Sequence, residues 1–337
     1  MKAVQLKKAN KHNPLIEISK VATPTPKADE VLIKVIAAAI NPVDWLIATN
    51  YTKAIIPITM PHLLGFEFAG EIIAQGEKVK DFSIGDRVYA MMPKEDFGAE
   101  AEKVAINEKY LAKIPNYLSY EQATTIPLSA LTAEQAYDLM DVQSGKTIFI
   151  SGGTGSVGAL AIPLAKARGL KVITNGSSRN QARVEKLGID QFIDYHQQDY
   201  SQILSNIDYV LDTRGNQDIP KEISILKPGG KIVSLIGNPN KKFAQRWGSS
   251  FLYTFAMGLL GRKFDKLAAK HGSASYDFVF GLADGQRLRK VSQFLEENQI
   301  PINVGKTITL NDAPMAIRET ANHHSNGKTI IKISSTN

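Results

Sequence analysis

A glycine-rich turn is the part of the chain best suited to hold a ligand. Residues 153–158 read GxGxxG; they follow a short β-type run, Thr147–Ile150, and precede an apolar segment with helical spacing. Such a turn directs backbone N–H groups toward a pyrophosphate. The sequence therefore predicts a dinucleotide site, with a glycine-rich turn that binds nothing as the alternative. Its predicted contacts are Gly153, Gly155, Ser156, Val157 and Gly158.

The segment after the next strand indicates which dinucleotide. A second β-type run, Lys171–Thr174, leads into Ser177, Ser178 and Arg179, where an NAD-binding protein would place an acidic residue for the ribose 2′-hydroxyl. No acidic residue occurs there, and guanidinium is well matched to phosphate. We therefore predict NADP(H) rather than NAD(H). The alternative is that Arg179 is a solvated residue opening the following helix.

Composition limits the other chemistries. The 337 residues suffice for two domains, and 43% hydrophobic with 22% charged residues is ordinary for a globular protein. Cysteine is absent, which excludes disulfides, thiolate catalysis and cysteine-ligated zinc. Neither a cleavable signal nor an apolar run of about 18 residues is evident, so we expect a cytoplasmic protein.

The net charge of +7 is compatible with several anionic partners. No basic run and no zinc-finger, RNP or basic-helix pattern accompanies this charge, so no DNA partner is expected. RNA or membrane-surface contact ranks below a small-molecule substrate.

The pattern of expected elements changes along the chain. The first 115 or so residues favour short strands separated by proline and glycine, at 3–6, 30–38, 71–75, 86–91 and 102–106. From Pro127 to Gly237, strands alternate with helices, which predicts a doubly wound parallel sheet; its strands are expected at 147–150, 171–174, 192–194, 209–212 and 231–235. The turn Lys227–Gly230 is interpreted as a helix-to-strand reversal ahead of the last of these strands.

Strand patterns return at 306–310 and 329–333, around a helix that begins near Asp312 and Pro314. The sheet domain is thus expected as an insertion at residues 123–289, within a β-rich domain of residues 1–122 and 290–337. An uncharged stretch, Trp247–Gly261, is too short to span a bilayer. A buried helix, a substrate lid or a subunit contact is expected there, with a membrane-surface helix as the alternative because basic residues flank it.

Several further segments match a known family. Asn41-Pro42-Val43-Asp44, the run GFEFAG at 65–70, GDRV at 85–88, the glycine turn and Gly327-Lys328 together resemble the medium-chain dehydrogenase/reductase superfamily over essentially the whole chain. The closest resemblance is to the zinc-free quinone oxidoreductases and the enone and alkenal reductases. It implies an α/β fold, with a GroES-like irregular β domain and a Rossmann domain, and it implies a homodimer.

The zinc-binding members of that superfamily carry Gly-His-Glu where this chain has Gly65-Phe66-Glu67. Their ligand cysteines are also missing, and catalytic zinc needs three protein ligands. His62 alone is more typical of a structural histidine. We therefore expect no zinc and no other metal. Without a Lewis acid, hydride delivery to quinones or α,β-unsaturated carbonyls is favoured over alcohol oxidation.

The resemblance also implies residue roles. The loop with Asn41 and Asp44 is expected near the nicotinamide ribose and the substrate, although Asp44 is equally suited to cap the helix that follows. Tyr51 is a candidate proton donor. Further cofactor contacts are expected from Thr132, Tyr195, Thr213, Ile236 and Lys328.

The sequence thus predicts a zinc-independent, NADPH-dependent reductase of quinones, enones or enals. Two alternatives stay open: an enoyl-thioester reductase, and a nucleotide-regulated RNA-binding protein of the crystallin type.

Overall fold

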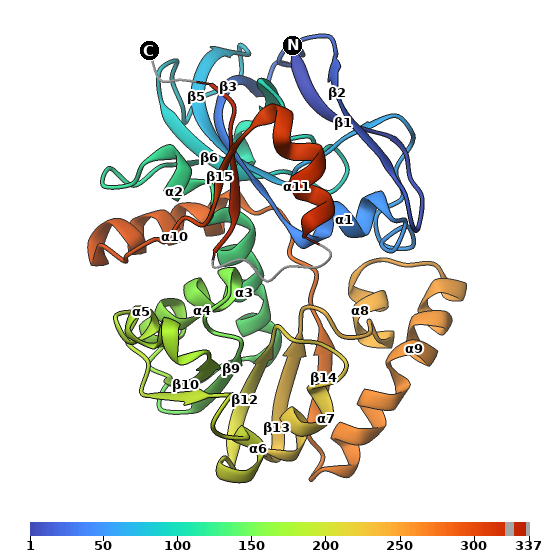
Figure 1. The fold of residues 1–337 in the computed structure, drawn as a ribbon, viewed down its shortest axis with the longest axis vertical. Helices are drawn as coiled ribbons and strands as arrows, with labels where there is room; N and C mark the ends of the chain where they lie inside the picture. The colour runs from blue at the N-terminus through green and yellow to red at the C-terminus, as the bar shows by residue number, and fades with distance from the viewer. Residues whose placement is uncertain (321–326, 335–337) are drawn as a thin grey trace. The chain divides into compact units, whose positions relative to one another are not determined.

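The computed structural model describes residues 1–320 and 327–334. The chain forms two compact units, coloured along the chain in Figure 1. The first unit contains Met1–Leu131 and Leu282–Asn337, and the second contains Thr132–Gly281. Residues 123–131 and 282–289 therefore belong to the first unit.

The second unit is built on one parallel sheet. Its strands are β9 (Thr147–Ser151), β10 (Lys171–Gly176), β11 (Gln191–Asp194), β12 (Ile207–Asp212), β13 (Leu226–Ser234) and β14 (Ser275–Phe278). They lie in the order β11-β10-β9-β12-β13-β14, and every pair is parallel. This is the strand order of a dinucleotide-binding doubly wound sheet, so that prediction is confirmed. The sixth strand, β14, was not predicted.

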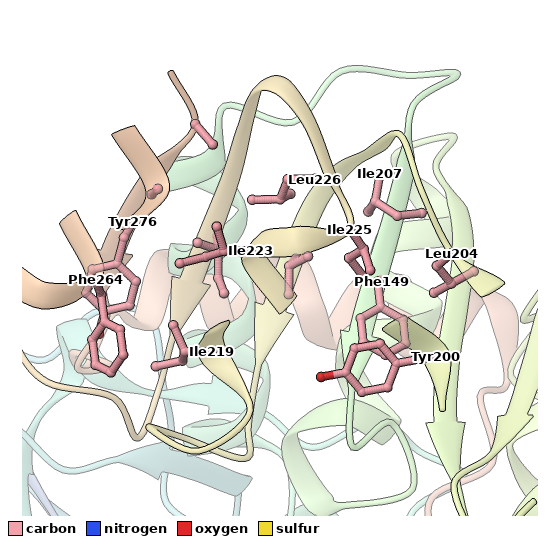
Figure 2. Close-up of a cluster of buried hydrophobic side chains, with 14 of the residues drawn as sticks. Phe149, Tyr200, Leu204, Ile207, Ile219, Ile223, Ile225, Leu226, Phe264 and Tyr276 are labelled. Atoms are coloured by element: carbon pink, nitrogen blue, oxygen red, sulfur yellow. The ribbon is translucent and has the colours of Figure 1, made fainter. Parts of the chain in front are cut away.

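Helices follow most of these strands. They are α4 (Ser156–Ala167), α5 (Gln181–Glu185), α6 (Tyr200–Ile203), α7 (Ile219–Ser224), α8 (Lys241–Arg246) and α9 (Phe251–Lys270), and α3 (Pro127–Met140) leads into the unit. Under one face of the sheet, Phe149 of β9 packs on Tyr200 with ring centroids 4.7 Å apart. Figure 2 shows this pair within a buried cluster that extends to Phe264 of α9 and Tyr276 of β14. The cluster fixes the strands whose carboxyl ends form the predicted site.

One predicted turn lies elsewhere than expected. Lys227–Gly230 does not precede β13 but lies inside it. Ile207 of β12 pairs with Leu226 and Tyr209 with Lys231, so the four intervening residues bulge out of register. Gly229 has a φ of 73°, which glycine adopts without strain.

The first unit contains two sheets. A small antiparallel sheet has the order β2-β1-β4, from β1 (Lys2–Lys8), β2 (Leu15–Lys20) and β4 (His62–Leu63). A larger one has the order β15-β16-β3-β5-β6-β8, with β7 also paired to β3. Its strands are β3 (Glu30–Ile40), β5 (Glu67–Gln75), β6 (Arg87–Met91), β7 (Lys103–Asn107), β8 (Ala112–Lys113), β15 (Thr307–Thr309) and β16 (Thr329–Lys332).

The helices of the first unit are short, apart from one of fourteen residues. They are α1 (Pro42–Ala48), α2 (Tyr120–Ala123), α10 (Gly285–Asn298) and α11 (Ala313–Glu319). Thr329 of β16 pairs with Ile40 at the end of β3. The predicted return of the last strands to the N-terminal half is therefore confirmed. In the described part of the chain, no helix is long and apolar enough to cross a membrane.

The stretch Trp247–Gly261 continues into the long helix α9. Met257 and Gly261 are buried, but Phe251 is 84% exposed and Phe255 is 62% exposed. The expectation of a buried helix is therefore wrong for most of these side chains, because only one narrow stripe of α9 faces the sheet.

Candidate functional site

The glycine turn is held at the carboxyl end of β9 by the end of β10. Gly153 N donates a hydrogen bond to Thr174 Oγ1 at 3.0 Å, and this hydroxyl donates to Ile150 O at 2.7 Å. Gly152 N donates to Asn175 Oδ1 at 2.7 Å. Sequence reasoning missed Thr174 and Asn175, although polar residues ending the neighbouring parallel strand were a usable signal.

The three glycines differ in what surrounds them. A Cβ on Gly158 would lie 2.4 Å from Gly153 Cα, and one on Gly153 would lie 2.0 Å from Thr174 Oγ1. Gly155 is exposed, has a φ of −78° and would place its Cβ 3.3 Å from Gly152 O, its one close neighbour. The protein itself therefore requires Gly153 and Gly158, whereas Gly155 leaves open space beside the N-terminus of α4. That space suits the predicted phosphate.

The carboxyl ends of β12 and β13 are tied together by a residue that sequence reasoning missed. Asp212 is fully buried. Its Oδ1 accepts hydrogen bonds from Arg214 N at 2.6 Å and Gly215 N at 2.9 Å. Its Oδ2 accepts a hydrogen bond from Ser234 Oγ. Thr213 Oγ1 donates to Ser151 O at 2.7 Å. Predicted residue Thr213 thus braces the strand that leads into the glycine turn.

Ile236, another predicted contact, is 59% exposed just beyond β13. Gly215 approaches it closely, because a Cβ there would lie 3.2 Å from Ile236 Cγ2. Both residues follow strands at the edge where ligands of such sheets bind. Their cofactor role stays a prediction.

The segment predicted to read the 2′-phosphate lies directly after β10. Ser178 and Arg179 are exposed and Ser177 is half-buried. One turn later, Arg183 of α5 donates through Nη2 to Thr154 O at 2.6 Å. Partial burial lowers the pKa of Arg183 from its ordinary value. This second arginine, spaced four residues from Arg179, was missed; it couples α5 to the glycine turn.

Two residues at the carboxyl end of β11 share this region. The pKa of Asp194 lies below its ordinary value because His196 N–H and Ser178 donate hydrogen bonds to the carboxylate. Asp194 is thus an anion beside Ser178, which sequence reasoning did not foresee. Tyr195 is 54% exposed and its ring centroid lies 4.3 Å from that of His196. The ring is available for the predicted stacking on adenosine.

In the first unit, Glu67 is the centre of a buried polar cluster. Its Oε1 accepts hydrogen bonds from Asn41 Nδ2 at 2.9 Å and from the Lys328 ammonium, and its Oε2 accepts from Leu128 N at 2.8 Å. Burial lowers the pKa of Lys328, an effect that the paired Glu67 carboxylate opposes. The structure thus brings together Asn41 and Lys328, two predicted residues, and adds Glu67 as their shared acceptor.

Asp44 lies at the edge of the same cluster. Its Oδ2 accepts a hydrogen bond from Asn41 N at 2.7 Å, so it does cap α1. Burial, reinforced by the Glu67 charge, raises the pKa of Asp44 to about 7. Glu100 is also fully buried, and burial together with Asp44 raises its pKa well above the usual value. Two carboxyl groups therefore retain protons far more readily than exposed ones would.

The two remaining predicted residues differ in exposure. Tyr51 follows α1 and is 79% exposed. Thr132 lies within α3 and is buried, with Gly281 so close that a Cβ there would approach its Oγ1 to 2.3 Å. The packing of Thr132 accounts for its burial without a ligand.

The residues in place of the usual zinc ligands do not suit a metal. Phe66 stacks on Phe97 with ring centroids 4.3 Å apart, and His62 contacts the same ring at 4.5 Å. Burial lowers the pKa of His62. Within residues 1–320 and 327–334, no group of three or more His, Cys, Asp or Glu side chains is placed to hold a metal ion. Glu67, which follows Phe66, is occupied by Lys328 and two further donors.

A doubly wound unit with a glycine turn, joined to an irregular β unit, defines the class of two-domain dinucleotide-dependent oxidoreductases. Two family models match this chain and agree with that class. They are an alcohol dehydrogenase GroES-like domain at residues 27–116 and a zinc-binding dehydrogenase at residues 187–331. The chain belongs to the medium-chain dehydrogenase/reductase superfamily, in the branch of the quinone and alkenal oxidoreductases.

Three similar proteins illustrate that branch. An NADPH-dependent alkenal/one oxidoreductase of Arabidopsis thaliana is 37% identical over 65% of this chain. The match covers 58% of the relative's length. A chloroplastic quinone-oxidoreductase homolog of Spinacia oleracea is 32% identical over 67% of this chain and 72% of its own. The solved quinone oxidoreductase of Coxiella burnetii has a TM-score of 0.81 and 27% identity, covering 99% of both chains.

Proposed function

We propose that the protein is an NADPH-dependent, zinc-independent reductase of quinones or of α,β-unsaturated aldehydes and ketones. The observation that carries this proposal is the end of β10, where Arg179 follows two serines and no acidic residue precedes it within the turn. Two relatives of the chain, an NADPH-dependent alkenal/one oxidoreductase and a quinone-oxidoreductase homolog, support the same activity.

The second unit would bind the dinucleotide, which supplies a hydride when bound. The N-terminus of α4 offers unpaired N–H groups to the pyrophosphate beside Gly155. Arg179 would contact the 2′-phosphate through a charge-assisted hydrogen bond. Because Asp194 is an anion beside Ser178, the positive charge of Arg179 is needed to make this region favourable for phosphate.

The acceptor must be able to spread negative charge, since the residues offer no Lewis acid for a localised alkoxide. Quinones and conjugated carbonyls meet this requirement. The Asn41 backbone and side chain are fixed by Asp44 and Glu67, so the loop that carries Asn41 is rigid. Tyr51, with its exposed side chain, is the proposed proton donor to the reduced acceptor.

An acceptor panel tests the proposal. The protein is mixed with NADPH or NADH and 1,4-benzoquinone, 9,10-phenanthrenequinone, 2-hexenal or 3-penten-2-one, with and without EDTA, and nicotinamide absorbance is followed. We expect turnover that prefers NADPH and is insensitive to EDTA. Tight NADPH binding with no turnover on any acceptor would overturn the reductase assignment and turn attention to RNA.

A homodimer is proposed with this function on the resemblance alone, and the cytoplasmic location expected from the sequence stays a proposal. Light scattering after size exclusion reports the mass of the particle. A value near 36.9 kDa, the mass of a single chain, would contradict the dimer.

A further inference from the structure

Helix α9, drawn in orange in Figure 1, packs on the rest of the second unit through a narrow stripe of buried side chains. Met257, Gly261, Phe264 and Ala268 are its buried residues. At Gly261 the helix touches α8 closely, because a Cβ there would lie 2.4 Å from Asn240 Cβ. Asn240 Nδ2 also donates to Asp265 Oδ1 at 2.9 Å. These contacts hold the buried side of α9 against the rest of the second unit. The orientation of the exposed side of the helix is thereby fixed as well.

The outer face carries an exposed apolar group in its first half. Leu252 is 78% exposed, Phe255 62% and Leu259 54%, and their spacing of three and four residues places them on one side of the helix. Three neighbouring large apolar side chains are each about half exposed or more: Phe251, Tyr253 and Leu260. Single exposed apolar residues are ordinary, but a contiguous group of this size marks an interaction surface.

The same side of the helix becomes basic in its second half. Arg262, Lys263, Lys266 and Lys270 are all exposed and continue the spacing of the apolar residues. From Lys241 to Lys270 the chain has seven basic residues and one acidic residue, Asp265, whose carboxylate is engaged by Asn240. We call the exposed side from Leu252 to Lys270 the outer stripe of α9.

A second copy of the chain fits this stripe poorly. A two-fold axis along the helix would set the basic half of one copy against that of the other. An axis across the helix would set each basic half against the apolar half of its partner. Neither arrangement supplies an anion for the four basic side chains.

An anionic lipid surface satisfies both halves together, because acyl chains accept the apolar residues and head groups accept the basic ones. We propose that the outer stripe of α9 docks the protein on an anionic lipid bilayer, with Phe255 and its neighbours inserted and Arg262 to Lys270 at the head groups. The helix lies in the interface rather than across it.

Flotation with vesicles tests this proposal on the full-length protein. Phosphatidylcholine vesicles are compared with vesicles that also contain phosphatidylglycerol, at low and high salt. We expect binding to the anionic vesicles that weakens with salt. The variant L252S/F255S/L259S should bind at least ~10-fold more weakly, since each replaced side chain loses its apolar burial. R262Q/K263Q/K266Q should lose on the order of 10- to 100-fold on anionic vesicles only.

A matched control changes three apolar residues that are similarly exposed outside the stripe, L15S/I84S/I203S. It should bind as the unaltered protein does. Circular dichroism and the thermal midpoint verify that each variant is folded. No vesicle binding at low salt, or equal binding by L252S/F255S/L259S and the unaltered protein, would overturn the proposal. So would a concentration-dependent dimer that L252S/F255S/L259S abolishes in the absence of vesicle binding.

Discussion

At the scale of single residues, the decisive chemistry lies in which charges are paired. The Glu67 carboxylate accepts hydrogen bonds from three donors, one of which is the Lys328 ammonium. By contrast, Asp44 Oδ1 and both carboxyl oxygens of Glu100 are buried without a hydrogen-bond partner. The sequence indicated the loop with Asn41 and Asp44, because its motif is local. It did not indicate Glu100 or the Lys328–Glu67 pair, because these residues meet only after distant segments fold together.

The buried Asp44 carboxyl predicts a pH dependence of stability. The unfolded chain binds this proton with a pKa of about 4, whereas in the folded chain the pKa is about 7. Between these values the folded state holds more protons, so stability falls as pH rises through this window, and Glu100 acts in the same direction. D44N should therefore flatten the fall of the thermal midpoint between about pH 4 and about pH 7.

Calorimetry at several pH values checks this, with D199N as the control. Asp199 is exposed and paired with Lys221, and the pKa of Asp199, about 2, lies outside the window. D199N should therefore leave the slope of the thermal midpoint against pH unchanged. An equal slope in D44N and the unaltered protein would contradict a raised pKa at Asp44.

At the scale of elements, the glycine turn shows how far local pattern reaches. Its strand, its glycines and its helix were all predicted, because they lie within one continuous segment whose spacing is typical of a dinucleotide-binding turn. β14 and the bulge in β13 were not, since both depend on pairing with strands distant in sequence. The exposed side of α9 was equally hidden, because an apolar stretch does not reveal which of its faces will be covered.

The glycines predict two different failures. Gly155→Ala should fold with little loss of stability but bind NADPH at least ~10-fold more weakly, because the new methyl group occupies the space proposed for phosphate. Gly158→Ala should lower stability by about 1–3 kcal/mol, because its Cβ would collide with Gly153 backbone. Urea unfolding and NADPH titration measure the two effects. If Gly155→Ala bound NADPH normally, the proposed phosphate position would be wrong.

At the scale of the whole molecule, the sequence predicted an α/β fold with a GroES-like β unit and a Rossmann unit, and this fold class is confirmed. The pairing of β16 with β3 joins the C-terminal segment to the N-terminal part of the first unit. The solved quinone oxidoreductase of Coxiella burnetii aligns with 99% of this chain. Substrate identity is less accessible to sequence, since it depends on side chains of irregular loops rather than of periodic elements, and the role of Tyr51 stays a proposal. The cofactor is easier to test, because the residues proposed to bind its pyrophosphate and its 2′-phosphate all belong to the second unit.

The most informative single measurement is the ratio of kcat/KM for NADPH to that for NADH, in the unaltered protein and in R179A. We expect a preference for NADPH that falls on the order of 10- to 100-fold in R179A, because a charge-assisted hydrogen bond to the 2′-phosphate is lost. The values for NADH should stay within about twofold, since NADH has no such phosphate. Equal losses with both cofactors, or an original preference for NADH, would contradict the proposed binding of the 2′-phosphate by Arg179.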